Sequence, residues 1–249
     1  MPIQTDAVGL DSRPIKIPTA DGELPGYQAM PSHGSLFPVV LVVQEIFGVN
    51  DYIQDVCRRL AKLGYLALAP ELYWRQGDVS KMTNLREITE KVVWQVPDAQ
   101  VMSDLDAAAD FATQGRGDVT RIGITGFCWG GRAAWLYATH SERLKAAVAW
   151  YGRLTGASDP LHPAYPIDVV SRLRCPVLGL YGALDASIPL DQVERMRAAV
   201  AAAHKNAEIV VYPEAGHAFH ADYRDHYYEP AARDGWMRMR EWFRQYGVA

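Results

Sequence analysis

Residues 122–136 read IGITGFCWGGRAAWL, a short apolar run followed by a glycine-flanked cysteine and a second apolar stretch. The first run ends at Thr125 and has the β-branched character of a buried strand, whereas helical spacing begins just past Cys128. Between them stands G-x-C-x-G-G, the pattern of a nucleophile elbow with cysteine in the position where serine is usual. The stretch therefore predicts a strand, a sharp turn that carries Cys128, and a helix.

The glycines of this turn have a steric reason. A strand-to-helix turn this sharp brings its flanking positions close to neighbouring backbone, where a Cβ at Gly126 or Gly130 would clash. The turn lifts the Cys128 side chain above the sheet at the start of a helix, where unpaired N–H groups and the helix dipole favour a thiolate. The Trp129 backbone N–H is then placed to bind an oxyanion.

Each of the three cysteines can also be interpreted as a structural thiol, because free cysteines are usually buried. For Cys128, the strand, the flanking glycines and the helix together favour the nucleophile. Cys57 lies in an amphipathic helical pattern and Cys175 precedes Pro176 at a strand start, so both keep the structural interpretation. The spacing of the three cysteines fits no zinc site. Free thiols suit a reducing compartment, which predicts a cytoplasmic location.

Outward from the elbow, short apolar runs alternate with helical patterns. Predicted strands cover residues 38–43, 66–69, 122–125, 146–150, 177–181 and 209–212. Predicted helices cover residues 52–63, 102–112, 133–139, 190–203 and 231–243. Strands that are apolar on both faces and alternate with helices predict an α/β fold, a mostly parallel sheet with helices on both faces. An antiparallel hairpin, residues 15–17 and 27–30 across Asp21-Gly22, brings the sheet to about eight strands.

The totals suit one domain over residues 1–249. The net charge is -4, from 25 basic and 29 acidic side chains without a basic run, so a nucleic-acid partner is not expected. The first residues lack the pattern of a targeting segment, and no window approaches the roughly 18 apolar residues of a membrane span. We expect a soluble protein without a membrane partner. The sequence does not indicate an oligomeric state, and we assume a monomer.

An elbow nucleophile needs a base and an acid that orients the base, in the chain order nucleophile, acid, histidine. Asp185 lies in a loop just after the predicted strand at 177–181. His217 lies in a glycine-containing loop just after the predicted strand at 209–212. The order Cys128, Asp185, His217 is the expected one, so we predict a Cys-His-Asp triad.

Other residues compete for two of these roles. The chain has 7 histidines, and His220 is the alternative to His217 as the base. Asp191 and Asp225 are the alternatives to Asp185. Asp191 lies at a predicted helix start, where it is expected to cap the helix or to interact with its dipole.

Five segments carry a resemblance to a known family. They are QEIFGVN at 44–50, PELY at 70–73, GFCWGG at 126–131, YGALD at 181–185 and EAGHAF at 214–219. On these segments, which run in order over nearly the whole chain, the sequence resembles the dienelactone hydrolase family, which includes carboxymethylenebutenolidases. The resemblance implies an α/β-hydrolase fold and a hydrolase.

The resemblance also implies roles that spacing alone does not indicate. The family glutamate that matches Glu45 contacts the nucleophilic thiol, and substrate binding redirects it so that the thiol is deprotonated. The Ile46 N–H would join that of Trp129 in the oxyanion hole. Taken without the resemblance, Glu45 is a loop residue that caps or pairs.

Substrate recognition is where the sequence departs from the family. Members that act on dienelactone hold its carboxylate with arginines, and Arg86, in the weakly patterned interval at 73–97, matches one of them. Another follows the histidine by four positions, where this chain has Ala221, and Arg224 lies three residues further on. We therefore expect Arg86, alone or with Arg224, to bind an anionic group of the substrate.

Aromatic side chains near the strand ends predict a largely apolar substrate pocket, although each is also typical of a core. They are Phe47, Trp74, Trp150, Tyr151 and Phe219. The Tyr151 hydroxyl would also donate a hydrogen bond.

Together these features predict hydrolysis of a small-molecule carboxylic ester or lactone. The Cys128 thiolate would form a thioester intermediate, with His217 assisting leaving-group protonation and attack by water. This chemistry needs no metal and no organic cofactor. The alternative is a non-enzymatic thiol protein that binds a ligand or senses redox state, which would share Cys128 but has no reason to keep His217 and Asp185 in order.

Overall fold

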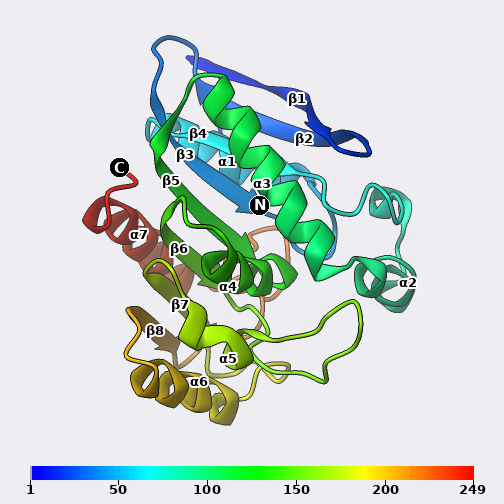
Figure 1. Cartoon of the computed structure of the whole chain (residues 1–249), viewed down its shortest axis with the longest axis vertical. Helices are drawn as coiled ribbons and strands as arrows, with labels where there is room; N and C mark the ends of the chain where they lie inside the picture. The colour runs from blue at the N-terminus through cyan, green and yellow to red at the C-terminus, as the bar shows by residue number, and fades with distance from the viewer. Residues whose placement is uncertain (1) are drawn as a thin grey trace.

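A computed structural model describes residues 2–249, and its central feature is an eight-stranded sheet (Figure 1). The strand order is β1-β2-β4-β3-β5-β6-β7-β8. The strands are β1 (Leu10–Thr19), β2 (Gly22–Pro31), β3 (Phe37–Val43), β4 (Leu66–Pro70), β5 (Gly117–Phe127), β6 (Leu144–Trp150), β7 (Val177–Gly182) and β8 (Ala207–Tyr212). The predicted number and positions of the strands are confirmed.

The sheet is parallel from β4 through β3, β5, β6 and β7 to β8. The hairpin β1–β2 is antiparallel, pairs Thr19 with Gly22 across the predicted turn, and joins the sheet where β2 runs antiparallel to β4. Its strands are longer than predicted. Ile17 and Leu24 are paired and buried, but the outer parts of β1 are solvated, so no apolar run marks their ends.

Helices cover both faces of the sheet, as predicted. The longer ones are α1 (Asp51–Lys62), α3 (Asp98–Gln114), α4 (Trp129–His140), α6 (Leu190–Ala202) and α7 (Glu229–Gln245). Figure 1 shows α3 and α4 in front of the sheet. On the other face, Phe127 packs against Tyr52 of α1 and against Trp150, which also meets Gly235 of α7.

The weakly patterned interval at 73–97 contains short helical segments. They are η1 (Val79–Lys81), α2 (Leu85–Lys91) and η2 (Val93–Gln95), and α5 (Pro166–Val169) and η3 (Val170–Arg172) form a similar insertion after β6. In α2 Ile88 is the buried residue, and the rest of the helix is solvated. A single buried position gives no helical periodicity, which explains the weak sequence pattern.

The arrangement of the strands determines where a site can form. The chain passes from β3 to β4 on one side and then crosses to β5 on the other side of β3. The strand order therefore reverses beside β3, which is the switch point at which open α/β sheets bind ligands. Residues Val39–Val43 are fully buried, so β3 is the centre of the core. These strands are parallel, so the carboxyl ends of β3, β5, β6, β7 and β8 lie at one edge of the sheet. The loops that follow them begin at that edge.

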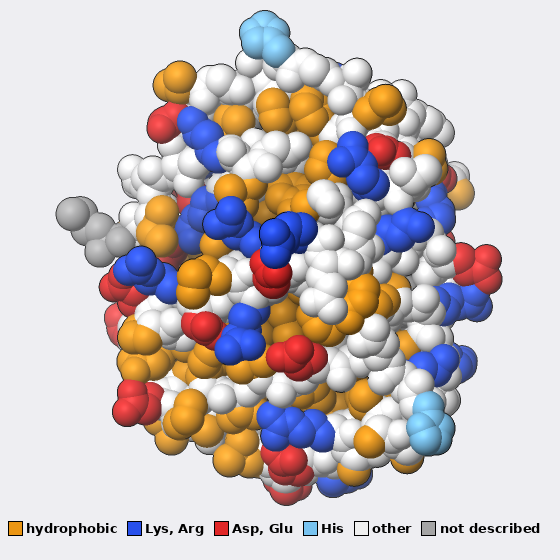
Figure 2. Space-filling view, turned by 90° about the vertical axis from the view of Figure 1, so that its left-hand side faces the viewer, with side chains coloured by type: hydrophobic (Ala, Val, Ile, Leu, Met, Phe, Trp, Pro, Cys, Tyr) orange, Lys and Arg blue, Asp and Glu red, His pale blue; other side chains and the backbone are white. Residues whose placement is uncertain are grey.

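The surface mixes charges of both signs. On the face in Figure 2, basic and acidic side chains are interspersed among apolar ones. Among residues 2–249, no helix combines the length and apolar character that a membrane crossing requires.

Candidate active site

Cys128 occupies the strained turn that the sequence predicts. β5 ends at Phe127 and α4 begins at Trp129, so Cys128 alone joins the strand to the helix. Its φ of 55° and ψ of -113° lie where residues with a Cβ are rarely found. Its N–H donates to the Trp150 carbonyl at 3.0 Å, which ties the turn to β6.

Three glycines make room for this turn. A Cβ on Gly126 would lie 2.0 Å from the Gly130 carbonyl oxygen, and one on Gly130 would lie 2.4 Å from that of Val43. One on Gly131 would lie 2.5 Å from the Trp150 carbonyl oxygen. Because backbone cannot yield as the end of a side chain can, any of these substitutions must shift the strand or the helix. The steric prediction for Gly126 and Gly130 is confirmed.

His217 lies between Cys128 and Asp185 and directs one ring nitrogen to each. Its Nε2 is 3.1 Å from Cys128 Sγ, and its Nδ1 is 2.6 Å from Asp185 Oδ2. This geometry fits an Nδ1–H that donates to the carboxylate, which leaves Nε2 to exchange a proton with the thiol. The structure thus brings together three residues from the ends of β5, β7 and β8.

Asp185 has a fixed orientation and a side chain that is only 1% exposed. The Ser187 N–H and hydroxyl donate to its Oδ1 at 2.8 and 2.6 Å, which leaves Oδ2 for His217. Burial alone would raise the pKa of Asp185, but the hydrogen bond and charge of His217 outweigh burial and lower it. Burial also disfavours protonated His217, yet hydrogen bonds with Asp185 and Cys128 raise its pKa well above the ordinary value.

The alternative base and acids lie in other surroundings. The His220 side chain is buried, its Nδ1 is 2.6 Å from the Tyr52 hydroxyl, and burial lowers its pKa to about 3. It is therefore a neutral residue of the core. Asp191 lies in the first turn of α6, as predicted, and Asp225 is exposed in the loop after β8.

The loop after β3 is braced by Glu71. The Gln44 side-chain amide donates to Glu71 Oε1 at 3.0 Å, and the Val49 N–H donates to Oε2 at 2.7 Å. Gly48 has a φ of 71°, and a Cβ there would lie 2.8 Å from the same carboxylate. The segments at 44–50 and 70–73, which both carry the family resemblance, are therefore hydrogen-bonded to each other. This contact holds the loop that contains Glu45.

The two N–H groups predicted for the oxyanion hole have no hydrogen-bond partner among residues 2–249. Ile46 lies in the braced loop, and Trp129 is the first residue of α4, where helical N–H groups lack an intrahelical acceptor. The Gly130 N–H donates to the Gln44 carbonyl at 3.1 Å, which ties the elbow to this loop. Both N–H groups are thus free to bind a ligand oxygen.

Glu45 is buried, and within the described residues it makes no hydrogen bond with Cys128. Its Oε2 accepts a hydrogen bond from the Tyr223 hydroxyl at 2.8 Å, and its Oε1 has no partner among residues 2–249. Burial raises the pKa of Glu45 despite the hydrogen bond from Tyr223 and the nearby positive charge of Arg224. Sequence reasoning missed Tyr223, because its polar loop carries no motif and no periodicity.

Two substrate-binding predictions need correction. Arg86 is not brought to the site, because its side chain is 83% exposed on α2 and paired with Glu90 of the same helix at 2.7 Å. Phe219 is fully buried and packs edge-on against Tyr151 at 5.1 Å, so it supports the site from within the core. Ala221, at the position of the second family arginine, is also fully buried.

Tyr151 adjoins the predicted base in a strained conformation. Its φ is 39°, and its ring centre lies 5.2 Å from that of His217. Its hydroxyl is buried without a hydrogen-bond partner among residues 2–249. A buried hydroxyl in this state costs about 1–3 kcal/mol, and a positive φ is unfavourable for tyrosine.

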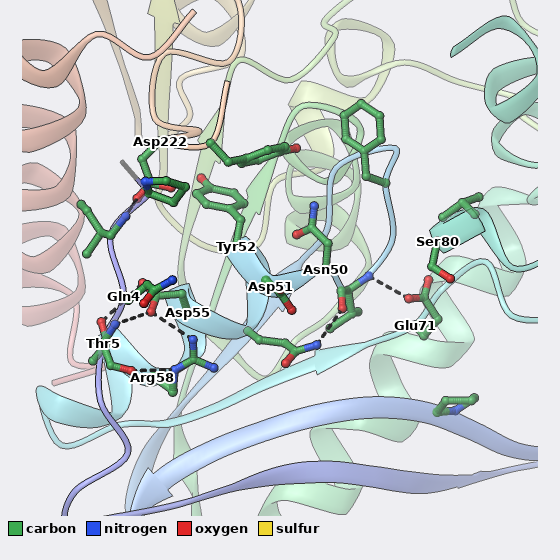
Figure 3. Close-up of a pocket in the computed structure, with 18 of the residues that line it drawn as sticks. Gln4, Thr5, Asn50, Asp51, Tyr52, Asp55, Arg58, Glu71, Ser80 and Asp222 are labelled. Carbon is green, nitrogen blue, oxygen red and sulfur yellow. Dashed lines mark hydrogen bonds and ion pairs between the residues drawn. The ribbon is translucent and has the colours of Figure 1, made fainter. Parts of the chain in front are cut away.

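A cavity of about 1190 Å³ lies beside this region, and Phe47, Trp74 and Tyr223 line part of it, whereas Glu45, Cys128 and His217 do not. Figure 3 shows Gln4, Thr5 and Asp55 on one side of it, Glu71 and Ser80 on the other, and Asn50 and Asp51 between them. The Arg224 guanidinium lies over the Phe47 ring, 5.3 Å from its centre. Arg224, and not Arg86, is thus the arginine that lies close to Glu45.

The two other cysteines have the buried environment predicted for structural thiols. Cys57 is fully buried on α1, and Cys175 is nearly so. Burial raises the pKa of Cys57 strongly and that of Cys175 to about 12, so neither ionises readily. Within residues 2–249, no three His, Cys, Asp or Glu side chains are grouped so as to bind a metal ion.

Comparisons with known proteins agree with one another. The model of the dienelactone hydrolase family matches residues 24–247. A provisionally named carboxymethylenebutenolidase of Methylorubrum extorquens is 62% identical over 248 residues, which cover 99% of this chain and 85% of the relative. The crystal structure of a provisionally named dienelactone hydrolase from Klebsiella pneumoniae is 54% identical with a TM-score of 0.94, covering 95% of this chain and 99% of that one. An esterase from Pyrobaculum calidifontis is 19% identical, with a TM-score of 0.72 over 96% of this chain and 86% of its own, and shares the fold.

Proposed function

Because the chain belongs to the dienelactone hydrolase family and is a hydrolase with the α/β-hydrolase fold, we propose that it cleaves a carboxylic ester or lactone through Cys128. Membership of a hydrolase family decides against the alternative of a non-enzymatic thiol protein. The observation that carries the proposal is the position of His217, with one ring nitrogen on Cys128 and the other on Asp185. The buried surroundings of Cys57 and Cys175 favour Cys128 over them.

The proposed reaction has two halves. The Cys128 thiolate attacks the carbonyl carbon, the carbonyl oxygen becomes an oxyanion, and the N–H groups of Ile46 and Trp129 stabilise it. Collapse of this intermediate breaks the bond to the leaving alkoxide, which takes the Nε2 proton of protonated His217, and leaves a thioester. His217 then removes a proton from water, the hydroxide attacks the thioester, and the carboxylic acid leaves as Cys128 is regenerated. Asp185 keeps the imidazole oriented and stabilises its charged form throughout.

Glu45 would assist deprotonation of Cys128 when substrate is bound. Its side chain is buried, and its loop is tied to the turn that carries Cys128. Its Oε1 has no hydrogen-bond donor among residues 2–249, and a buried carboxylate oxygen without a donor is a strong proton acceptor. Both observations support this role. The resemblance to the family implies the same role.

The substrate is a small molecule, and its recognition would combine apolar and polar contacts. Phe47 and Trp74 line the adjoining cavity, and the unpartnered Tyr151 hydroxyl is free to donate to a ligand beside His217. If the substrate carries a carboxylate, the structure favours Arg224 over Arg86 as its partner. We also propose that residues 1–249 form one domain, and the free cysteines support a reducing, cytoplasmic location.

Kinetics of three single variants test the proposal. Cys128→Ala should abolish hydrolysis of aryl esters and lactones, whereas Cys57→Ala and Cys175→Ala, the matched controls, should retain most of it. Near-parental turnover by a folded Cys128→Ala protein would overturn the proposal. A panel of aryl esters, neutral lactones and carboxylate-bearing lactones would identify the substrate class in the same experiment.

A further inference from the structure

Tyr223 is held in place from three directions. Its ring packs edge-on against Phe47 at 6.4 Å and lies 5.3 Å from the Tyr52 ring of α1. The adjacent Asp222 pairs at 2.5 Å with Arg59, also on α1, which fixes this part of the loop after β8. The side chain reaches inward to Glu45, yet Tyr223 remains 37% exposed and lines the cavity of Figure 3. Tyr223 therefore contacts both a buried carboxylate and the adjoining cavity.

Within residues 2–249, the Glu45 carboxylate accepts one hydrogen bond, and its donor is the Tyr223 hydroxyl. The titratable and charged groups that interact with Glu45 come from several elements. They are Tyr52 of α1, Tyr73 after β4, Tyr151 after β6, and His217, Tyr223 and Arg224 of the loop after β8. Of the two positive groups, His217 is engaged with Cys128 and Asp185, and Arg224 lies over Phe47.

We propose that Tyr223 is a positioning residue that keeps Glu45 ionised and hydrogen-bonded away from Cys128, ready to accept the thiol proton once substrate is bound. The inference rests on the proposed function, because it concerns how Cys128 is deprotonated. The step moves one proton from Cys128 Sγ to a Glu45 carboxylate oxygen, and the sulfur keeps the electron pair with which it attacks the carbonyl carbon. His217 keeps its own Nε2 proton for the leaving alkoxide, and Glu45 returns the thiol proton when Cys128 is regenerated. Only an ionised Glu45 can accept that proton.

Loss of the Tyr223 hydroxyl removes this donor from a buried carboxylate. A hydrogen bond donated to a carboxylate favours its ionised form, so Glu45 will stay protonated up to a higher pH in Tyr223→Phe. The acid limb of the kcat/KM profile for a neutral aryl ester should then move up by about one to two pH units. Above the shifted limb, kcat/KM should return to within about threefold of the parental value. A purely structural role for Tyr223 would lower kcat/KM by the same factor at every pH.

The experiment compares kcat/KM profiles of the parent, Tyr223→Phe, Glu45→Gln and the double variant. If Tyr223 acts through Glu45, the double variant should match Glu45→Gln within about twofold at every pH. Tyr228→Phe is the matched control, because Tyr228 lies in the same loop and donates to the exposed carboxylate Glu214, and its profile should not move. An unshifted acid limb in Tyr223→Phe, or independent losses in the double variant, would overturn the inference. Failure of the proposed function is separately visible as turnover by Cys128→Ala.

Discussion

The turn that carries Cys128 and the loop that follows β8 contribute neighbouring parts of one site but are determined in different ways. The turn is fixed by backbone sterics, since a Cβ at Gly126 or Gly130 would collide with carbonyl oxygens. The loop is fixed by side chains that reach distant elements, such as Asp222 to Arg59 and Tyr223 to Glu45. Short-range steric rules leave a pattern in the sequence, whereas long-range side-chain contacts leave none.

Two histidines of that loop show how strongly position decides chemistry. His217 and His220 are three residues apart, and hydrogen bonds with Asp185 and Cys128 raise the pKa of His217, whereas burial lowers that of His220 to about 3. The His220 ring stacks on Phe127 and on Trp236, and its Nδ1 is hydrogen-bonded with the Tyr52 hydroxyl. One histidine thus contacts a thiol and a carboxylate, and the other packs among aromatic rings.

The largest expected effect separates these histidines by activity. His217→Ala should lower kcat by three or more orders of magnitude, roughly the scale of triad knock-outs, and Asp185→Asn by somewhat less. The double variant should lose little more than His217→Ala, because triad residues act as a unit. His220→Gln is the control and should keep kcat within about tenfold of the parent. Additive losses in the double variant would show that the wrong residues have been paired.

The second prediction compares a glycine of the turn with one of the loop. Gly126→Ala should lower the free energy of unfolding by about 3 kcal/mol or more, since the new Cβ would meet the Gly130 carbonyl oxygen at 2.0 Å. Gly216→Ala should change it by less than about 1 kcal/mol, since the nearest atom to that Cβ is 3.9 Å away. Urea unfolding followed by circular dichroism measures both. Equal stability of the two variants would contradict the steric account of the elbow.

The third prediction concerns two arginines, one in the loop and one on α2. Arg224→Ala should lower kcat/KM for a carboxylate-bearing lactone by about 10- to 100-fold more than for a neutral aryl ester, from the usual strength of hydrogen bonds to charged groups. Arg86→Ala should change neither value more than about twofold, because Arg86 is exposed and paired with Glu90. Steady-state kinetics on both substrates provide the comparison. A selective loss in Arg86→Ala instead would restore the sequence-based assignment of the anion contact.

The fourth prediction concerns the pH dependence of stability, where the change within any one pH unit is small. The pKa of His220 falls from 6.5 to about 3 on folding, so below pH 6.5 the unfolded chain binds a proton that the folded chain does not. Stability should therefore decrease as the pH falls from about 6.5 toward 3, by at most about 1.4 kcal/mol per pH unit from this residue. His220→Gln should flatten this slope between pH 6 and pH 4, as measured by urea unfolding at each pH. An unchanged slope would show that His220 is protonated in the folded protein.

Much of the fold and part of the site followed from the sequence, and the reasons are physical. β3 is apolar on both faces, and residues 122–127 of β5 are buried throughout. Asp185 and His217 each follow a parallel strand closely, so backbone order alone places them at one edge of the sheet. Solvated α2 and the outer ends of the hairpin escaped detection because little of them is buried. Glu45 needed the family resemblance.

The substrate side of the site was less predictable. Arg86 matched a family position, but a helix of seven residues with a single buried position gives no sign of the direction in which its arginine points. Phe219 follows His217 by two residues, and whether such an aromatic ring faces the ligand or the core depends on contacts from other elements. Tyr223 is joined to Glu45 across 178 positions of the chain, which no local pattern records.

The most direct test of the account is to identify the residue that carries the acyl group during turnover. The protein is mixed with an aryl ester, quenched in acid within the first turnovers, digested and analysed by mass spectrometry. We predict that the acyl mass is found on the peptide containing Cys128, is removed by hydroxylamine as expected for a thioester, and is absent from Cys128→Ala. An acyl group on another residue, or hydrolysis at parental rate with no acylated Cys128, would contradict the central claim.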